Sequence, residues 1–403
     1  MVPNFVRKKF AGVQQPLGRW ILRHVCEFIV LSPAILVTWI WLKVRRKEIL
    51  IVGRFSSSIT AFLMPLDPEL RRRAKNLGQL EKLVVLNLSP DANSHIRIMY
   101  DRVVRIVGAE KPLFRRVLWW SSFVISRVEE KEILKCQDDP HWHYSDPVIA
   151  LTDEEIRRGE SLLREVGFDL NQAFVCYATR TDSYYQKLRE TGVNAKSRAV
   201  RNPNESVYLD VGKSLNLKGL NIVRMGKDLD SKISIEIYPW IFDYSSVCRS
   251  DFLDVILLSQ CRFLINGATG MVLLRAIFNL PTVNSDTYRM HENWFADDNA
   301  TFQRVRFIKD GRMATVGEMV AIGDNFSDER HQGALGVELV KNTAEEILAA
   351  CEEMIARLNG TWITTEEDEI LQTKYWDLVA VKGQHHGGRI GAQFLRDNQD
   401  LLR

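Results

Sequence analysis

The chain has 403 residues, of which 46% are hydrophobic and 26% charged, and a formal net charge of +3. This composition excludes disordered and collagen-like proteins, and the length is sufficient for two domains with hydrophobic cores. The six cysteines form no CxxC pair, which disfavours a disulfide framework or a paired-cysteine zinc site and favours a reducing compartment.

The positive charge is concentrated at the N-terminus. Residues 1–47 contain nine basic residues and one acid, Glu27, whereas the rest of the chain contains 45 basic and 50 acidic residues. The leader therefore carries a charge of +8 and the body a charge of −5. This is not the even basic surface of a nucleic-acid-binding protein, and no nucleic-acid partner is expected.

The leader has the features of a membrane anchor. Residues 28–42 carry no charge, tryptophans stand at positions 20, 39 and 41, and basic residues follow at 43–47. As a helix the charge-free run would be only ~22 Å long, short of the ~30 Å hydrocarbon core, and Ser32-Pro33 would bend it. Basic residues on both flanks favour a re-entrant or in-plane anchor over a full span. A buried helix of a soluble protein is the remaining alternative.

Residues 48–150 are predicted to form a first Rossmann-like domain. Apolar runs at 48–55, 83–88 and 103–107 predict strands, and a proline-containing turn opens a predicted helix over 67–83. Strands that alternate with helices indicate a parallel sheet covered on both faces.

Residues 151–362 show the same alternation of strands and helices and are predicted to form a second Rossmann-like domain. A capping signature at 152–155 opens a helix, and strands are predicted at 172–178, 220–226, 261–266 and 280–283. Residues 342–358 are predicted to be a further capped helix. The fold class expected is α/β, with two Rossmann-like domains facing a cleft and an N-terminal membrane-associated helix before them. Residues 363–403 are expected to return to the first domain.

The strand ends of the second domain carry groups suited to a diphosphate. Ligands of open parallel sheets bind beyond the carboxyl ends of the strands. Arg180 and Arg224 would bring two guanidiniums to that edge, with Gly226 following the second. Thr269 and Gly270 stand at a helix start, where free backbone N–H groups attract phosphate oxygens. Together these residues predict a cradle for a nucleotide diphosphate.

Other polar residues are candidates for supporting roles. Asp182, and after it Asp243, could deprotonate an acceptor hydroxyl, with turn and capping roles as the alternative. Asn342 and Glu346 are candidates for nucleotide contacts, and capping of their own helix is the more ordinary role.

Several cofactor and metal motifs are absent. Neither first strand is followed by GxGxxG, and GxxxxGK[ST], GxSxG and HExxH do not occur. Asp228 and Asp230 have a metal-binding spacing but fit a solvated turn better, and His141 and His143 lack a third ligand. No metal or cofactor is therefore expected, and a nucleotide sugar would serve as co-substrate.

Seven segments of the second half follow one another in a characteristic order, and they are VCYATRTDSYY, RNPNESVYLDVGKSL, NIVRMG, FDYSS, SDFLDVILLSQCRFLINGATG, FNLP and KNTAEEI. In this order and spacing they resemble a family of bacterial glycosyltransferases linked to surface-polysaccharide gene sets. The resemblance implies a GT-B-like transferase with its acceptor side in 48–150 and its nucleotide-sugar side in 151–362. It also implies a lipid-linked or polysaccharide acceptor, at the cytoplasmic face of the inner membrane.

Two alternatives remain open at this stage. Ala178 stands where the family usually has a histidine, so a catalytically inactive membrane-bound scaffold is one alternative. Another enzyme that uses nucleotide sugars, such as an epimerase, would also need two Rossmann-like halves.

Overall fold

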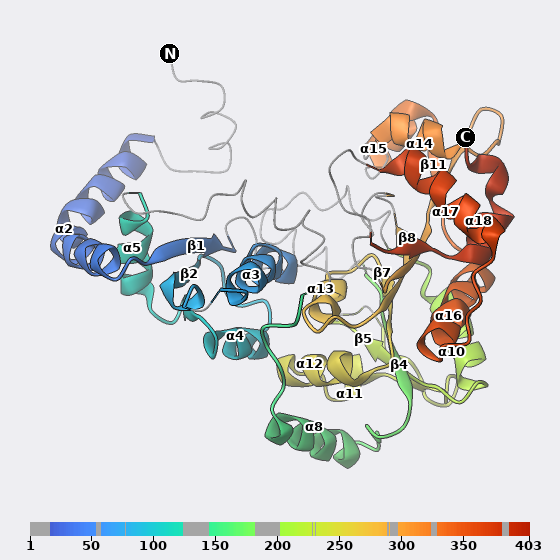
Figure 1. The fold of residues 1–403 in the computed structure, drawn as a ribbon, viewed down its shortest axis with the longest axis horizontal. Helices are drawn as coiled ribbons and strands as arrows, with labels where there is room; N and C mark the ends of the chain where they lie inside the picture. Colours follow the sequence, from blue (N-terminus) through green and yellow to red (C-terminus); the bar gives the residue numbers. More distant parts are fainter. Residues whose placement is uncertain are drawn as a thin grey trace.

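The computed structural model describes residues 17–53, 58–76, 78–123, 145–181, 202–227, 229, 231–287, 290, 297–323, 329–380 and 387–403. These residues form two α/β units, each built on a parallel sheet, with the long helix α2 (Leu17–Val44) at the N-terminal end (Figure 1). The predicted α/β class with two parallel, helix-covered sheets is confirmed.

The N-terminal unit contains a three-stranded sheet in the order β1-β2-β3. Its elements are β1 (Glu48–Val52), α3 (Ile59–Ala74), η1 (Leu80–Lys82), β2 (Leu83–Asn87), α4 (Ser94–Asp101), β3 (Arg105–Val107) and α5 (Pro112–Ser121). Alternate strand residues point to opposite faces. Leu50 and Val85 pack with α3 and α4, whereas Ile49 and Val84 pack with Leu118 of α5.

Helix α3 begins earlier than the sequence predicts, and it contains two prolines. Ser58 is its N-cap and accepts a hydrogen bond from the backbone N–H of Ala61, and Pro65 and Pro68 lie inside the helix. Proline has no N–H to donate to the carbonyl four residues before it. The carbonyl of Ala61 instead accepts from the N–H of Gly53, at 3.1 Å. This contact with the end of β1 compensates for the lost helical bond, so the helix tolerates Pro65.

The C-terminal unit contains a seven-stranded parallel sheet in the order β12-β9-β8-β7-β4-β5-β6. Its strands are β4 (Phe174–Ala178), β5 (Asn221–Met225), β6 (Ile241–Phe242), β7 (Leu264–Gly267), β8 (Thr282–Thr287), β9 (Asn299–Phe302) and β12 (Arg389–Ile390). The predicted strands 172–178, 220–226, 261–266 and 280–283 correspond to β4, β5, β7 and β8.

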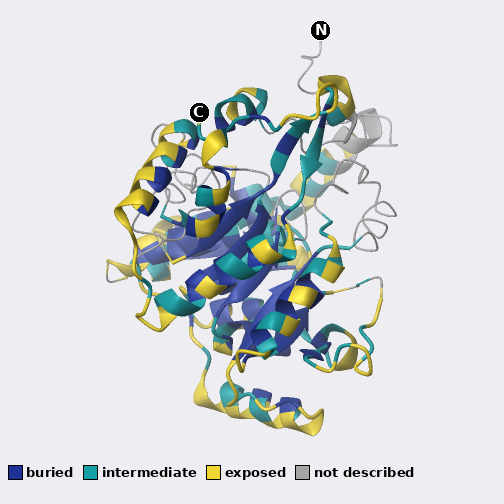
Figure 2. Ribbon diagram, turned by 90° about the vertical axis from the view of Figure 1, so that its right-hand side faces the viewer, coloured by how far each residue is buried: buried dark blue, intermediate teal, exposed yellow. Residues whose placement is uncertain are grey.

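Helices cover both faces of this sheet. One face packs against α10 (Glu205–Asn216) and α16 (Ala344–Leu358), and the other against α12 (Asp251–Gln260) and α13 (Met271–Ala276). Figure 2 shows the buried strands between helices whose outer surfaces are exposed. Outside them lies α8 (Asp153–Glu165), whose predicted capping box at Thr152 and Glu155 is confirmed.

The C-terminal segment corrects one expectation. Its described part does not return to the N-terminal unit, because β12 pairs with β9 at the edge of the seven-stranded sheet. This segment contains α17 (Glu366–Val379), α18 (Ala392–Asp397) and η4 (Gln399–Leu401). It packs with a small subdomain formed by β10 (Arg304–Phe307), α14 (Val316–Ile322), α15 (Glu329–Leu335) and β11 (Val337–Val340). The short helix α11 (Tyr244–Val247) lies elsewhere, next to β5. Tyr375 stacks on Phe302 of β9 and Phe394 meets the same ring edge-to-face, so aromatic contacts hold the segment against the seven-stranded sheet.

The two units share one hydrophobic cluster and several polar contacts. The cluster contains residues of α3 and α4 as well as α12 and α13. Arg71 of α3 is buried, pairs with Asp67 at 2.7 Å, and donates to the carbonyls of Ala276 and Ile277 at the end of α13. At the start of α4, the backbone N–H of Ser94 donates to the carboxylate of Asp251 at 2.8 Å. These contacts fix α3 and α4 against the second sheet.

Candidate ligand-binding site

The candidate site lies where the strand order of the seven-stranded sheet reverses. From β4 the chain proceeds outward to β5 and β6, then crosses to β7 and proceeds through β8 and β9 in the opposite direction. Loops that leave adjacent strands at such a switch point diverge and leave a crevice at the carboxyl edge. Ala178 at the end of β4 is in register with Met225 of β5 and Asn266 of β7. The loops that begin with Thr179 and Ala268 therefore meet at this edge.

The turn after β7 is held by its own side chains. The Oδ1 atom of Asn266 accepts hydrogen bonds from the backbone N–H of Thr269, at 3.1 Å, and from its hydroxyl, at 2.7 Å. The Thr269 hydroxyl in turn accepts from the N–H of Met271, at 3.2 Å. Ala268 adopts a φ of 55°, a left-handed conformation that is costly for alanine. The backbone N–H of Thr269, which was predicted to attract phosphate, is thus paired within the turn, and the Thr269 hydroxyl shapes the same turn. Asn266 is a positioning residue that was not predicted from the sequence.

Gly270 brings the N-terminal unit to the switch point. A Cβ atom at this position would lie 2.8 Å from Cγ2 of Ile59 and 3.3 Å from Oγ1 of Thr60. Both residues belong to the first turn of α3, so the absence of a side chain at Gly270 allows this helix to approach. The N-terminus of a helix carries a partial positive charge. The β7–α13 turn and the start of α3 therefore lie together at the carboxyl edge.

Arg180 lies two residues beyond the last residue of β4 and is half-buried. Its position in the chain places it at the carboxyl edge of the sheet, beside the β4–β7 switch point. Asp182, the first candidate for a catalytic base, lies outside the described residues.

Arg224 does not meet its prediction, because it belongs to a buried ion-pair cluster. Its side chain is fully buried. Its Nε and Nη2 atoms donate to Glu205 at 2.7 and 2.8 Å, and Nη1 donates to the carbonyl of Ser231 at 2.7 Å and contacts Asp243 at 3.3 Å. The reason is its place within β5: a residue still in a strand directs its side chain to a sheet face, here toward α10. Two carboxylates neutralise the guanidinium that was expected to bind a diphosphate.

Asp243 is also part of this cluster. Burial would raise the pKa of its carboxyl, but hydrogen bonds from the Ser245 hydroxyl and the Ile233 N–H, together with Arg224, lower that pKa below its ordinary value. A carboxylate with a lowered pKa and several donors is a weak proton acceptor. The predicted role of Asp243 as a catalytic base is therefore corrected to a structural one.

Gly226 has a conformational role in the loop after β5. Its φ is 151°, and a Cβ atom would lie 2.8 Å from Cδ2 of Leu229. Glycine is required at this position because other residues rarely adopt this φ and because a side chain would clash with Leu229.

Asn342 and Glu346 connect strands and cap a helix. The buried side chain of Asn342 accepts from the N–H of Asp286, at 2.7 Å, and from the Thr301 hydroxyl, at 2.8 Å. Glu346 completes a capping box with Thr343 and pairs with Arg304 at 2.8 Å. Glu346 therefore has the capping role that was its alternative. The side chain of Asn342 is buried and bonded within the protein, so the predicted contact of Asn342 with a nucleotide is wrong.

The carboxyl edge of the three-stranded sheet offers a carboxylate that the sequence analysis did not select. Asp91 follows β2 and accepts from Nδ2 of Asn87, at 2.9 Å, with Arg97 at 3.6 Å. Partial burial raises the pKa of Asp91 above its ordinary value despite the opposing effect of Arg97. The rule that site residues follow strand ends, applied to the strand at 83–88, would have identified it.

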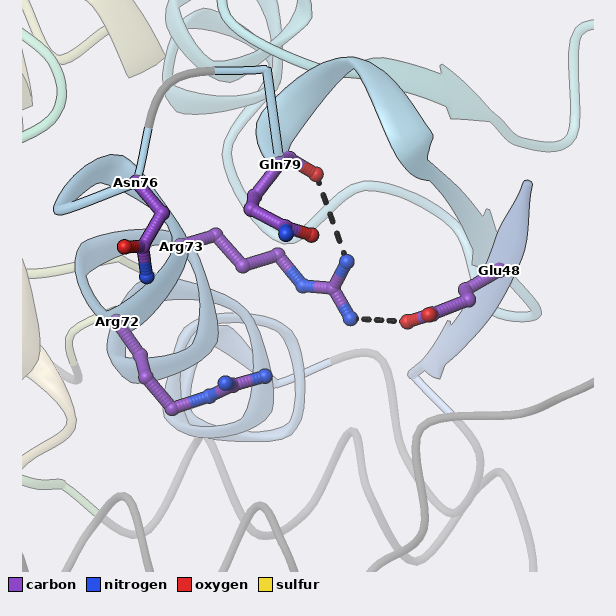
Figure 3. A pocket seen from close by; sticks show the side chains of 5 residues that line it. All are labelled: Glu48, Arg72, Arg73, Asn76 and Gln79. Atoms are coloured by element: carbon purple, nitrogen blue, oxygen red, sulfur yellow. Dashed lines mark hydrogen bonds and ion pairs between the residues drawn. The ribbon is translucent and has the colours of Figure 1, made fainter. Parts of the chain in front are cut away.

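Among the described residues, neither a metal-binding cluster nor the pocket shown in Figure 3 lies at the switch point. Among the described residues, no group of three or more His, Cys, Asp or Glu side chains could hold a metal ion, and His141, His143, Asp228 and Asp230 fall outside them. A pocket of about 270 Å³ (Figure 3) is lined by Glu48, Arg72, Arg73, Asn76 and Gln79. It lies at the amino end of β1, opposite the predicted edge. Arg73 there bonds to Glu48 and Glu69, so its charge is already compensated.

Comparisons with known proteins show similarity at low identity. No protein-family model and no curated protein matches the chain. Among solved structures, the chain is similar to E. coli ADP-heptose LPS heptosyltransferase II, with 12% identity, 60% of this chain and 85% of that chain covered, and a TM-score of 0.41. It is also similar to a family 9 glycosyl transferase from Veillonella parvula, with 9% identity, 59% and 79% coverage and a TM-score of 0.34. E. coli heptosyltransferase WaaC gives 11% identity, 63% and 92% coverage and a TM-score of 0.35. Similarity of this degree transfers no substrate or residue role to this chain.

Proposed function

We propose that the protein is a glycosyltransferase that moves a sugar from a nucleotide-sugar donor to a lipid-linked or surface-polysaccharide acceptor. The observation that carries the proposal is the convergence at one switch point of Arg180, the Ala268–Gly270 turn and the first turn of α3. The motif order of the second half, which resembles bacterial surface-polysaccharide glycosyltransferases, supports the same activity.

In the proposed reaction these groups stabilise the leaving diphosphate. Cleavage of the sugar–phosphate bond places negative charge on the diphosphate oxygens. Arg180 would donate charged hydrogen bonds to them, and the backbone N–H of Gly270 and the positive end of α3 would add to the stabilisation at the same edge. Because these donors are fixed before the substrate binds, they can lower the barrier without reorganising.

A carboxylate is needed to accept the proton of the acceptor hydroxyl. Asp182 retains this role as a proposal, since it follows Arg180 directly after Thr181. Asp91 is the second proposed base because its raised pKa favours proton uptake and it lies on the N-terminal unit, the proposed acceptor side. Loss of acceptor-dependent transfer with retained donor binding in only one of Asp182→Asn and Asp91→Asn would assign the base.

The N-terminal helix supports a membrane-linked acceptor. Within α2, residues His24–Val44 have a mean hydropathy of 2.0 and are long and apolar enough, by length and composition, to cross a membrane. We place the protein at the inner membrane with its body on the cytoplasmic side, where nucleotide sugars are available. No metal is assigned to the reaction, so transfer is expected to persist in EDTA.

The test is binding and turnover with a panel of nucleotide sugars and nucleoside diphosphates. One nucleoside diphosphate should raise the melting temperature, and the matching nucleotide sugar should release nucleotide slowly without acceptor and faster with membrane lipid extract. The control is Arg262→Ala, an arginine at the opposite edge of the sheet, before β7. If no nucleotide stabilises the protein, the proposal fails.

An inactive scaffold is the second candidate. Ala178, where the family usually has a histidine, is buried at the end of β4 and offers no proton acceptor. Nucleotide binding without any turnover across the panel would favour this candidate.

A further inference from the structure

Helix α2 has one face toward the body and one face toward the outside. Its less exposed residues recur at helical spacing, and the most buried of them are Ile35, at 7% exposure, and Leu42, at 0%. The opposite face is apolar and exposed, and its residues are Leu22, Val25, Ile29, Val30, Leu36, Val37, Ile40, Trp41 and Val44. Only 11% of the apolar segment is buried. We call these nine residues the outer face.

Both halves of α2 meet the same short stretch of α5. In the first half, Phe28 packs edge-to-face on Trp120 with ring centroids 5.2 Å apart, and Glu27 lies 3.6 Å from Arg116. In the second half, Leu42 belongs to the same buried cluster as Leu118. A straight helix would separate positions 28 and 42 by ~21 Å, whereas Leu118 and Trp120 lie within one turn.

The helix meets this requirement by bending. Figure 1 shows α2 bent into two arms beside α5. Pro33 lies between the two contact regions, and the hydroxyl of Ser32 donates to the carbonyl of Ile29 at 2.7 Å. A proline inside a helix removes a backbone hydrogen bond and bends the axis.

The chemistry of the outer face matches a lipid bilayer better than a protein partner. Lys43, Arg45 and Arg46 are exposed at the end of α2, where they can reach anionic headgroups. The Nζ atom of Lys43 lies 5.0 Å from the ring centroid of Trp39, and Trp41 is exposed beside it. Tryptophans and cations at the border of an apolar surface are typical of the membrane interface.

We infer that α2 is a monotopic anchor, which inserts its outer face into one leaflet of a phospholipid bilayer while both of its ends stay on the side of the body. A spanning α2 would have to leave α5, which would expose the apolar cluster around Leu42 and move Glu27 into hydrocarbon without Arg116. Leu113 of α5 and Phe123 just after it are 64% and 56% exposed and extend the apolar surface from the body. This inference does not depend on the transferase activity.

The test uses the full chain, with a protease-cleavable tag at each end, bound to preformed liposomes of phosphatidylethanolamine and phosphatidylglycerol. The monotopic arrangement predicts that protein floats with the liposomes and that added protease removes both tags without detergent. An N-terminal tag that is protected until detergent is added, while the C-terminal tag is cleaved, would show a span and overturn the inference.

Outer-face variants test the surface itself. Ile29→Glu combined with Val37→Glu changes two residues that are 62% and 67% exposed, so folding should be unaffected and flotation should fall at least tenfold. The matched control is Leu217→Glu, which changes a residue that is 82% exposed on the other unit and should float like the wild type. Unchanged flotation of the double variant, or dimerisation through α2 in place of liposome binding, would contradict a bilayer as the occupant of the outer face.

Discussion

The two arginines selected from the sequence lie at two places along the carboxyl edge of the seven-stranded sheet, which we call the β5–β6 corner and the β4–β7 corner. The surroundings of the two arginines differ. At the β5–β6 corner, Arg224 is fully buried between Glu205 and Asp243, and its charge is matched within the protein. At the β4–β7 corner, Arg180 is half-buried and lies beyond the last paired residue of its strand, at the edge where the Ala268–Gly270 turn meets the start of α3.

The difference shows how one or two positions decide the role of an arginine at the end of a strand. Within the strand, a side chain leaves perpendicular to the sheet and must be neutralised in the core. Beyond the strand, it can follow the loop toward the carboxyl edge, where ligands of parallel sheets bind. The β5–β6 corner is therefore interpreted as structural and the β4–β7 corner as the ligand site.

The largest expected effect is on stability at the β5–β6 corner. Arg224→Ala leaves Glu205 and buried Asp243 without their cation, which should lower the free energy of unfolding by about 3–5 kcal/mol. Urea denaturation measures this loss. The control Arg306→Ala removes an exposed pair with Glu338 and should cost less than about 1 kcal/mol. A stable Arg224→Ala protein that has lost nucleotide affinity would reverse the assignment of the two corners.

A pH effect is expected from Asp298, which lies just before β9 in the same sheet. Burial raises the pKa of Asp298 to about 7, although the N–H of Thr282 and Nδ2 of Asn284 donate to its carboxylate. The native state then holds a proton that the unfolded state releases above about pH 4. The free energy of unfolding should therefore fall as pH rises from about 4 to about 7, by up to about 4 kcal/mol.

Asp298→Asn isolates this contribution because the amide stays neutral. Its stability relative to the wild type should increase between about pH 4 and about pH 7 and then level off. Asp377→Asn, at an exposed position of α17, serves as the control and should follow the wild-type profile. Parallel profiles for Asp298→Asn and the wild type would show that the carboxyl is ionised in the native state.

A binding effect is expected at the β4–β7 corner. Arg180→Ala should weaken nucleoside diphosphate binding by about 1.5–3 kcal/mol, the contribution of a charged hydrogen bond. Isothermal titration calorimetry measures the affinity, and Arg262→Ala should bind like the wild type. Equal affinities for Arg180→Ala and the wild type would remove Arg180 from the site.

The smallest effect tests whether α3 truly adjoins this corner. Gly270→Ala should cost about 1–2 kcal/mol, because the new methyl group would press on Ile59. Combining it with Ile59→Ala should recover part of the loss, as contacting residues couple in a double-mutant cycle. The control Gly333→Ala adds a methyl group in open space and should not destabilise the protein. Strict additivity of the two changes would show that the contact does not exist.

The sequence predicts β1 to β5, β7 and β8 because each lies in a short apolar run whose period and length are local properties. It misses β6 and β9 to β12, which are four residues long or shorter. It predicts the start of α3 poorly, since Pro65 is tolerated only through the contact between Gly53 and Ala61, which depends on tertiary structure. The role of Arg224 was misassigned for a similar reason. Its partners Glu205 and Asp243 each lie 19 positions away, and no spacing rule connects them. The switch point itself depends on strand order, which local patterns do not encode.

The most direct test of the proposed site is the structure of the protein with the nucleoside diphosphate that stabilises it most. We expect the diphosphate to lie beyond β4 and β7, within hydrogen-bonding distance of Arg180 and of the backbone N–H of Gly270. A diphosphate bound at the opposite edge, beside Arg72 and Arg73, or held by Arg224 after displacement of Glu205, would contradict this expectation.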